Sequence, residues 1–127
     1  MSAEAVVDLA ALRGNIRALR ARIGSAAVMS VVKADAYGHG MVPCARAAVE
    51  AGATWLGTAV PEEALALRAA GITPDQARVL CWLWTPDSPW EQTVQASIDI
   101  SVSGEWALRR VVDAVRATGS TARVARP

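Results

Sequence analysis

Short apolar runs and amphipathic segments alternate along this chain with a nearly constant spacing. The apolar runs that predict buried strands occupy residues 26–33, 53–60, 78–84, 98–102 and 121–124. Successive runs begin roughly 20 to 25 residues apart, and a segment with helical periodicity fills each interval. Strands joined by right-handed helical crossovers pair in parallel. We therefore expect a parallel α/β sheet.

Helix start and stop signals locate the segments between the strands. Leucine and isoleucine recur at helical spacing in residues 9–22, with Asp8 as the expected N-cap and Gly24 as the expected stop. Weak alternation in residues 4–8 predicts a short strand before this helix. One later helix is expected to hold Pro43 in its first turn, and the others are expected to begin at Pro61, the capping-box sequence 88–91 and Ser103.

Length and composition limit the classes of protein that remain. A chain of 127 residues can form one domain with a real core, whereas a (β/α)8 barrel needs roughly 250 residues. An open doubly wound sheet and a piece of a barrel both fit the pattern. A net charge of +1 without a basic cluster argues against nucleic-acid binding. The longest apolar runs are far shorter than the ~20 residues of a membrane span, so no membrane association is expected.

The N-terminus and the cysteines both favour a cytoplasmic protein. Residues 1–4 lack the basic start and the long apolar region of a secretory signal. Cys44 and Cys81 belong to no CxxC pattern and are expected to be two buried free thiols. A second histidine or a spaced cluster of cysteine or aspartate is lacking, so we expect no metal site.

The first apolar run ends in the only lysine of the chain. Lys33 follows that run directly, and the other twelve of the thirteen basic side chains are arginine. Parallel sheets and barrels bind ligands at the carboxyl ends of their strands. A lysine amine can condense with a carbonyl, whereas the guanidinium of arginine stays protonated. Lys33 is therefore a candidate for a Schiff base with an aldehyde cofactor such as pyridoxal phosphate.

The loop after this lysine holds the only tyrosine and the only histidine. Tyr37 can donate a hydrogen bond to a phosphate or a ring oxygen, and the glycines of residues 38–40 permit a tight turn. Judged on these residues alone, a surface role for Lys33 and a packing role for Tyr37 stay open. We interpret Glu62 and Glu63 as acids that the helix dipole favours in a first turn.

Residues 27–40 read Ala-Val-Met-Ser-Val-Val-Lys-Ala-Asp-Ala-Tyr-Gly-His-Gly and resemble the cofactor-lysine signature of the alanine racemase family. Residues 7–12 with Asn15 resemble the opening segment of that family, and residues 51–53 with 62–68 resemble its next two units. The likeness runs over almost the whole chain. It implies the N-terminal part of a (β/α)8 TIM-type barrel, with about five parallel strands alternating with helices and a barrel that this chain does not complete.

The resemblance implies an isomerase that uses pyridoxal 5′-phosphate to interconvert L- and D-alanine and so supplies D-alanine for the bacterial cell wall. Lys33 matches the lysine that forms the Schiff base and serves as acid and base on one face of the substrate. Tyr37 matches the tyrosine that contacts the cofactor phosphate, Trp82 aligns with an apolar residue beside the cofactor ring, and His39 matches a motif histidine with a structural role. In the family a tyrosine from the partner subunit of a homodimer serves the other face.

Members of this family are much longer than the present chain. We therefore expect residues 1–127 to form a partial barrel, with the C-terminal half of the barrel, the β-rich domain and the second catalytic base absent. Such a chain would be truncated and inactive alone. Two alternatives are a non-enzymatic module that binds pyridoxal phosphate or maintains its supply, and a remnant without a ligand.

Overall fold

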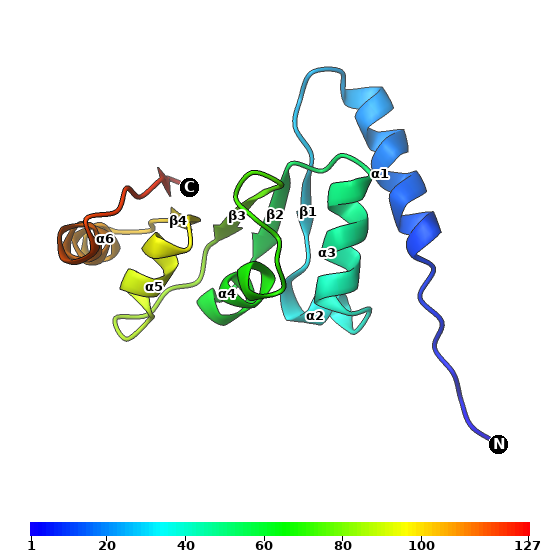
Figure 1. The fold of residues 1–127 in the computed structure, drawn as a ribbon, viewed down its shortest axis with the longest axis horizontal. Coiled ribbons are helices and arrows are strands. Elements are labelled where there is room, and N and C mark those ends of the chain that lie inside the picture. Colours follow the sequence, from blue (N-terminus) through cyan, green and yellow to red (C-terminus); the bar gives the residue numbers. More distant parts are fainter.

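Five strands form, and all of them pair in parallel in chain order (Figure 1). The structure is a computed structural model that describes residues 1–127. The strands are β1 (Met29–Val31), β2 (Trp55–Thr58), β3 (Arg78–Cys81), β4 (Ile98–Ser101) and β5 (Val124–Ala125). The helices are α1 (Leu9–Ile23), α2 (Lys33–Tyr37), α3 (Met41–Glu50), α4 (Pro61–Ala69), α5 (Trp90–Gln95) and α6 (Glu105–Thr118).

The order of the strands distinguishes an open doubly wound sheet from a piece of a barrel, which the length of the chain left undecided. In a doubly wound sheet the strand order reverses at a central strand. Here each strand lies beside the one that precedes it in the sequence, as in a (β/α) barrel, and β1 and β5 form the two edges of an open sheet. The prediction of about five parallel strands alternating with helices is confirmed.

Alternate side chains of the strands point to opposite faces of the sheet, and the two faces are covered differently. The face against the helices is fully buried, and its strand residues include Leu56, Val79, Cys81, Ile98 and Ile100. The other face carries larger side chains that are only half-buried, among them Trp55, Leu80 and Trp82. The hydrophobic core therefore lies between the sheet and the helices, and the second face is still partly open.

The first helix follows its sequence signals closely. An oxygen of the Asp8 carboxylate accepts the N–H of Ala11 at 3.0 Å, and Gly24 ends the helix at a φ of 65°. The strand predicted for residues 4–8 does not form. These residues are exposed and extend away from the sheet in Figure 1, so no neighbouring strand completes their hydrogen bonds.

Two of the helix caps predicted from the sequence, Ser88 and Ser103, are wrong. The Ser88 hydroxyl accepts the N–H of Thr85 at 2.9 Å and is therefore engaged in the preceding turn instead of capping α5. The last long helix begins at Glu105 after Gly104, so Ser103 is not its cap.

None of the helices combines the length and the hydropathy that a membrane span requires.

The spacing of apolar residues predicts that one face of α6 carries Ala107, Leu108, Val111, Val112 and Val115, and this prediction is only partly correct. Ala107, Val111 and Ala114 are buried, but Leu108 and Val112 are 44% and 39% exposed. The helix packs chiefly against α5, which buries a narrower stripe than the one the spacing of apolar residues suggested.

Candidate functional site

Lys33 lies where the chain leaves the sheet at the carboxyl end of β1. The buried residue before it, Val32, still donates its N–H to the carbonyl of Gly57 at 2.9 Å and so attaches this point to β2. The predicted strand continued to Lys33, but the ladder ends at Val31 because the chain then turns sharply. Lys33 itself is half-buried and takes part in none of the four ion pairs of the structure.

The turn after the lysine is left-handed. Ala34, Asp35, Ala36 and Tyr37 have φ angles of 52°, 55°, 51° and 54°. Such a conformation costs an L-residue roughly 1–2 kcal/mol, so four in succession need support from their surroundings. We expected glycine to carry the unusual conformation of this loop, and here four residues with side chains adopt it.

Hydrogen bonds from Asp35 and His39 close this turn. The carboxylate of Asp35 accepts the N–H of Met41 at 2.8 Å, and its carbonyl accepts the N–H groups of Gly38 and Gly40, both at 3.0 Å. The Nδ1 of His39 donates to the carbonyl of Ala36 at 2.8 Å. The histidine thus contacts backbone within its own loop in this structure.

Glu63 supports the turn from outside. Its Oε2 accepts the N–H of Ala34 at 2.5 Å, while its Oε1 accepts the N–H groups of Ala59 and Val60 at 3.0 and 3.1 Å. Interpreting Glu63 only as a helix-start acid was incomplete. Nothing local could reveal the contact with Ala34, because the two residues are 29 positions apart.

The three residues singled out from the sequence lie at the same end of the sheet. The Nζ of Lys33 lies 5.9 Å from the centre of the Tyr37 ring. Tyr37 is 73% exposed. Trp82 follows β3 directly and is half-buried, so one strand, β2, separates it from the strand that carries Lys33.

Gly57 makes room for Trp82 on this face. A Cβ added at Gly57 would lie 3.0 Å from both the Trp82 ring and the sulfur of Met29, and 3.1 Å from Val31. These distances are shorter than ordinary van der Waals contact. The glycine in β2 therefore leaves space that side chains of β1 and the Trp82 ring approach from either side.

A buried charge that sequence reasoning missed lies within β4 of the same sheet. Asp99 of β4 is 3% exposed, and its carboxylate forms ion pairs with Arg78 and with Arg123, the latter at 2.9 Å. The Arg78 guanidinium also lies 4.1 Å from the centre of the Trp55 ring. The available signal was an aspartate between two isoleucines of a buried strand.

Both thiols are buried and free, as expected. Burial raises the pKa of the Cys81 thiol to about 12, and a hydrogen bond with Thr58 opposes this shift in part. Burial and, secondarily, the nearby charge of Asp35 raise the pKa of Cys44. Neither cysteine is suited to act as a nucleophile at neutral pH, since nucleophilic attack needs the thiolate.

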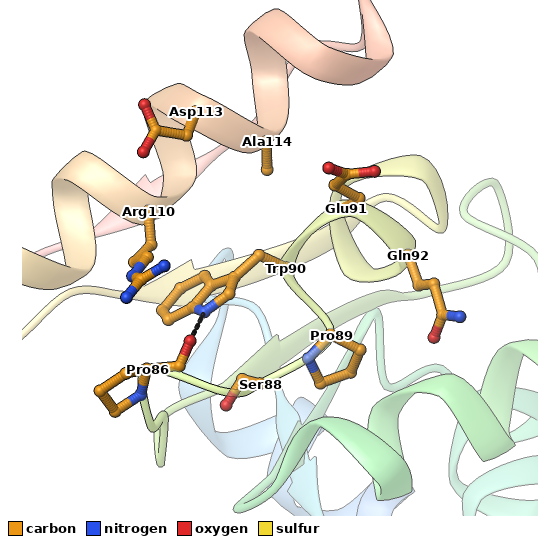
Figure 2. Close-up of a pocket in the computed structure, with 9 residues that line it drawn as sticks. All are labelled: Pro86, Ser88, Pro89, Trp90, Glu91, Gln92, Arg110, Asp113 and Ala114. Carbon is orange, nitrogen blue, oxygen red and sulfur yellow. Dashed lines mark hydrogen bonds between the residues drawn. The ribbon is translucent and has the colours of Figure 1, made fainter.

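Two hollows of similar size lie outside the lysine site. One of about 450 Å³ lies beside β1 and the turn; Tyr37 and His39 line it, but Lys33 does not. The other, of about 440 Å³, lies between the start of α5 and α6 (Figure 2). In the second hollow the indole N–H of Trp90 donates to the carbonyl of Pro86 at 3.2 Å, and Trp84 stacks on the same ring at 4.8 Å. Trp90 is thus occupied by packing.

Comparisons with known proteins point to one family. Residues 7–125 match the family model described as the N-terminal domain of alanine racemase. The alanine racemase of Streptomyces coelicolor is 64% identical over 126 residues, which are 98% of this chain and 32% of that protein. That of Frankia casuarinae is 58% identical over 120 residues, 94% of this chain and 30% of that protein. The chain thus spans about a third of the length of these curated relatives.

Solved structures share the fold over most of the chain. The alanine racemase structure from Streptomyces coelicolor superposes with a TM-score of 0.90 at 64% identity, covering 94% of this chain and 32% of that one. A structure of the Bacillus anthracis enzyme with bound L-Ala-P gives a TM-score of 0.75 at 35% identity, covering 93% and 30%.

Proposed function

We propose, since this chain belongs to the family of alanine racemase N-terminal domains, that it supplies the cofactor-holding lysine of a pyridoxal 5′-phosphate-dependent alanine racemase. Its fold is the N-terminal part of a (β/α)8 TIM-type barrel. The rest of the barrel, a β-rich domain and a partner subunit would complete the enzyme in a homodimer. The substrate would be alanine, and D-alanine for the bacterial cell wall would be the product made in the cytoplasm.

The observation that carries this proposal is the setting of the Lys33 amine. It lies at the carboxyl end of a parallel sheet, without a carboxylate partner, on a turn that hydrogen bonds hold on both sides. An amine that is not held in a salt bridge is free to reach a carbonyl and attack it.

The residues present fit pyridoxal phosphate. When bound, this cofactor supplies an aldehyde that condenses with an amine and a conjugated ring that spreads negative charge. Lys33 would hold it through Nζ and carry a proton at that atom. The Tyr37 phenol would donate a hydrogen bond to the phosphate, and Trp82 would provide apolar contact for the ring.

Racemisation also needs a proton carrier on the opposite face of the substrate. Tyr37 is the only tyrosine of the chain and belongs to the same turn as Lys33, four residues further on. This closeness supports our assignment of Tyr37 to the cofactor side of the site. We assign the second proton carrier to a residue outside 1–127, so the chain alone would hold one half of the catalytic pair.

Reductive labelling tests the proposal directly. The chain would be incubated with pyridoxal phosphate, reduced with borohydride and digested for mass spectrometry. Because Lys33 is the only lysine, the N-terminal amine is the sole competing primary amine and serves as an internal reference. We expect the adduct at Lys33 in excess over the N-terminus, and its loss in Lys33→Arg.

The same samples would be assayed for D-alanine. We expect negligible D-alanine from the chain alone. An adduct confined to the N-terminal amine would contradict the cofactor role of Lys33 and favour a remnant without a ligand. Robust turnover would contradict the division of the catalytic pair between this chain and residues outside it.

A further inference from the structure

The carboxylate of Glu63 joins the backbone that follows β1 to the backbone that follows β2. One oxygen accepts the N–H of Ala34, and the other accepts those of Ala59 and Val60. Hydrogen bonds from N–H donors to an ionised carboxylate are roughly twice as strong as neutral ones. A single half-buried side chain therefore connects the carboxyl ends of two neighbouring strands.

Ala34 is a point at which such a connection acts directly on the lysine. It follows Lys33 directly and is the first of the four left-handed residues. Its N–H belongs to the peptide group that Lys33 and Ala34 share, so a bond to this N–H restrains the backbone of the lysine itself. The other hydrogen bonds of the turn involve Asp35, Ala36 and His39, and the N–H of Ala36 donates to the carbonyl of Val32 at 2.9 Å, on the other side of the lysine.

We infer that Glu63 is a positioning residue for Lys33, which holds the peptide between Lys33 and Ala34 in place against the loop after β2. The role assigned to Lys33 rests on the proposed function, whereas the restraint on the peptide group does not. Glu62, in the same turn of α4, is exposed and takes part in no ion pair or side-chain hydrogen bond, which makes it a matched control.

Amide hydrogen exchange of the full chain tests the restraint. In Glu63→Gln the amide oxygen can still accept from Ala59 and Val60, but the amide nitrogen then meets the Ala34 N–H as a second donor. We expect exchange at Ala34 to accelerate about 10- to 100-fold, as the loss of a hydrogen bond to a charged group predicts. Glu62→Gln should change this rate by less than about twofold. Unchanged protection of Ala34 in Glu63→Gln would overturn the inference.

A measurement on the unmodified chain covers the case in which Glu63→Gln does not fold. The Ala34 amide proton should resonate far downfield of the other loop amides, because its acceptor is an ionised carboxylate at short range. A chemical shift within the range of the other loop amides would equally overturn the inference.

Labelling with pyridoxal phosphate and borohydride then tests the effect on the lysine. In Glu63→Gln we expect the adduct at Lys33 to fall several-fold relative to the N-terminal amine, with no fall in Glu62→Gln. Lost protection of Ala34 with an unchanged ratio of adducts would overturn the positioning role. A wild-type chain that forms no adduct at Lys33 would instead overturn the proposed function, and Ala34 exchange would still show whether Glu63 restrains the peptide.

Discussion

Asp99 is the one charged residue among the buried side chains, and two arginines from neighbouring strands neutralise it. Burying an unpaired carboxylate is costly, so the pairing with Arg78 and Arg123 makes its position tolerable. The two arginines are 41% and 48% exposed, so water can solvate them if the carboxylate is lost. The cluster links β3, β4 and β5 on the open face of the sheet.

We therefore predict that Asp99→Asn lowers the free energy of unfolding by about 1–3 kcal/mol, because two charge-assisted hydrogen bonds are weakened in a buried setting. Urea unfolding monitored by circular dichroism measures the change. Asp113→Asn on the exposed surface of α6 is the control and should stay within about 0.5 kcal/mol of wild type. Equal stability of the two variants would show that the buried cluster contributes nothing.

The raised pKa of Cys81 gives a second prediction at the residue scale. With a folded-state pKa of about 12, Cys81 would be ionised to roughly one part in a thousand at pH 9. We expect iodoacetamide to modify Cys81 at pH 9 only after unfolding in urea, as peptide mass spectrometry would show. Rapid labelling of the native chain would contradict the burial.

The sign of the linked effect on stability follows from the same shift. The unfolded thiol has a pKa near 8.5, so between that value and about 12 the unfolded state releases a proton that the folded state keeps. The contribution of Cys81 to stability is therefore complete below about pH 8.5 and is lost progressively as the pH rises toward the folded value.

At the scale of the elements, the packing over β2 depends on the missing side chain of Gly57. Gly57→Ala would place a methyl group 3.0 Å from Met29 and Trp82. We predict a loss of about 1–3 kcal/mol in the free energy of unfolding, as for other overpacked sites. A change in tryptophan fluorescence should accompany it, because the Trp82 ring must move.

Gly14→Ala is the matched control for this prediction. Gly14 lies inside α1, and an added Cβ there meets nothing within 4 Å. Alanine should therefore stabilise the chain by about 0.5–1 kcal/mol, since glycine is the poorer helix former. Destabilisation by both variants would argue against steric crowding as the cause at Gly57.

At the scale of the whole molecule, the sheet has two unpaired edges and a face that is still partly open. Val31 at one edge and Val124 at the other are 51% and 47% exposed. Exposed strand edges and apolar surface favour pairing with another chain. In the family that this chain belongs to, relatives are about three times as long, and the remainder of the barrel would cover these surfaces.

We predict that the isolated chain self-associates with increasing concentration. Sedimentation velocity should show a rising mean mass, and Val31→Lys should reduce it, because a charge on an edge strand opposes pairing. The control is Leu19→Lys, which replaces an exposed apolar residue of α1 away from both edges. A monomer at all concentrations would contradict the prediction.

The sequence by itself determined that the fold is a parallel α/β sheet, and it singled out Lys33 as the candidate site residue. Regular alternation of apolar runs and helical segments predicted a parallel sheet, and local signals such as Asp8 and Gly24 predicted where α1 begins and ends. These features could be predicted because hydrophobic periodicity and helix capping act between residues close in sequence. The placement of Lys33 at a strand end follows from the same periodicity.

Only the tertiary structure decided how that lysine is held. The left-handed turn after it is unfavourable in every one of its residues, so no local preference predicts it. Three contacts are between residues at least 21 positions apart. Glu63 accepts a hydrogen bond from the turn, the Trp82 ring lies close to Gly57, and Asp99 pairs with Arg78. Such contacts exist only once the strands are side by side, which is why local patterns along the chain do not contain them.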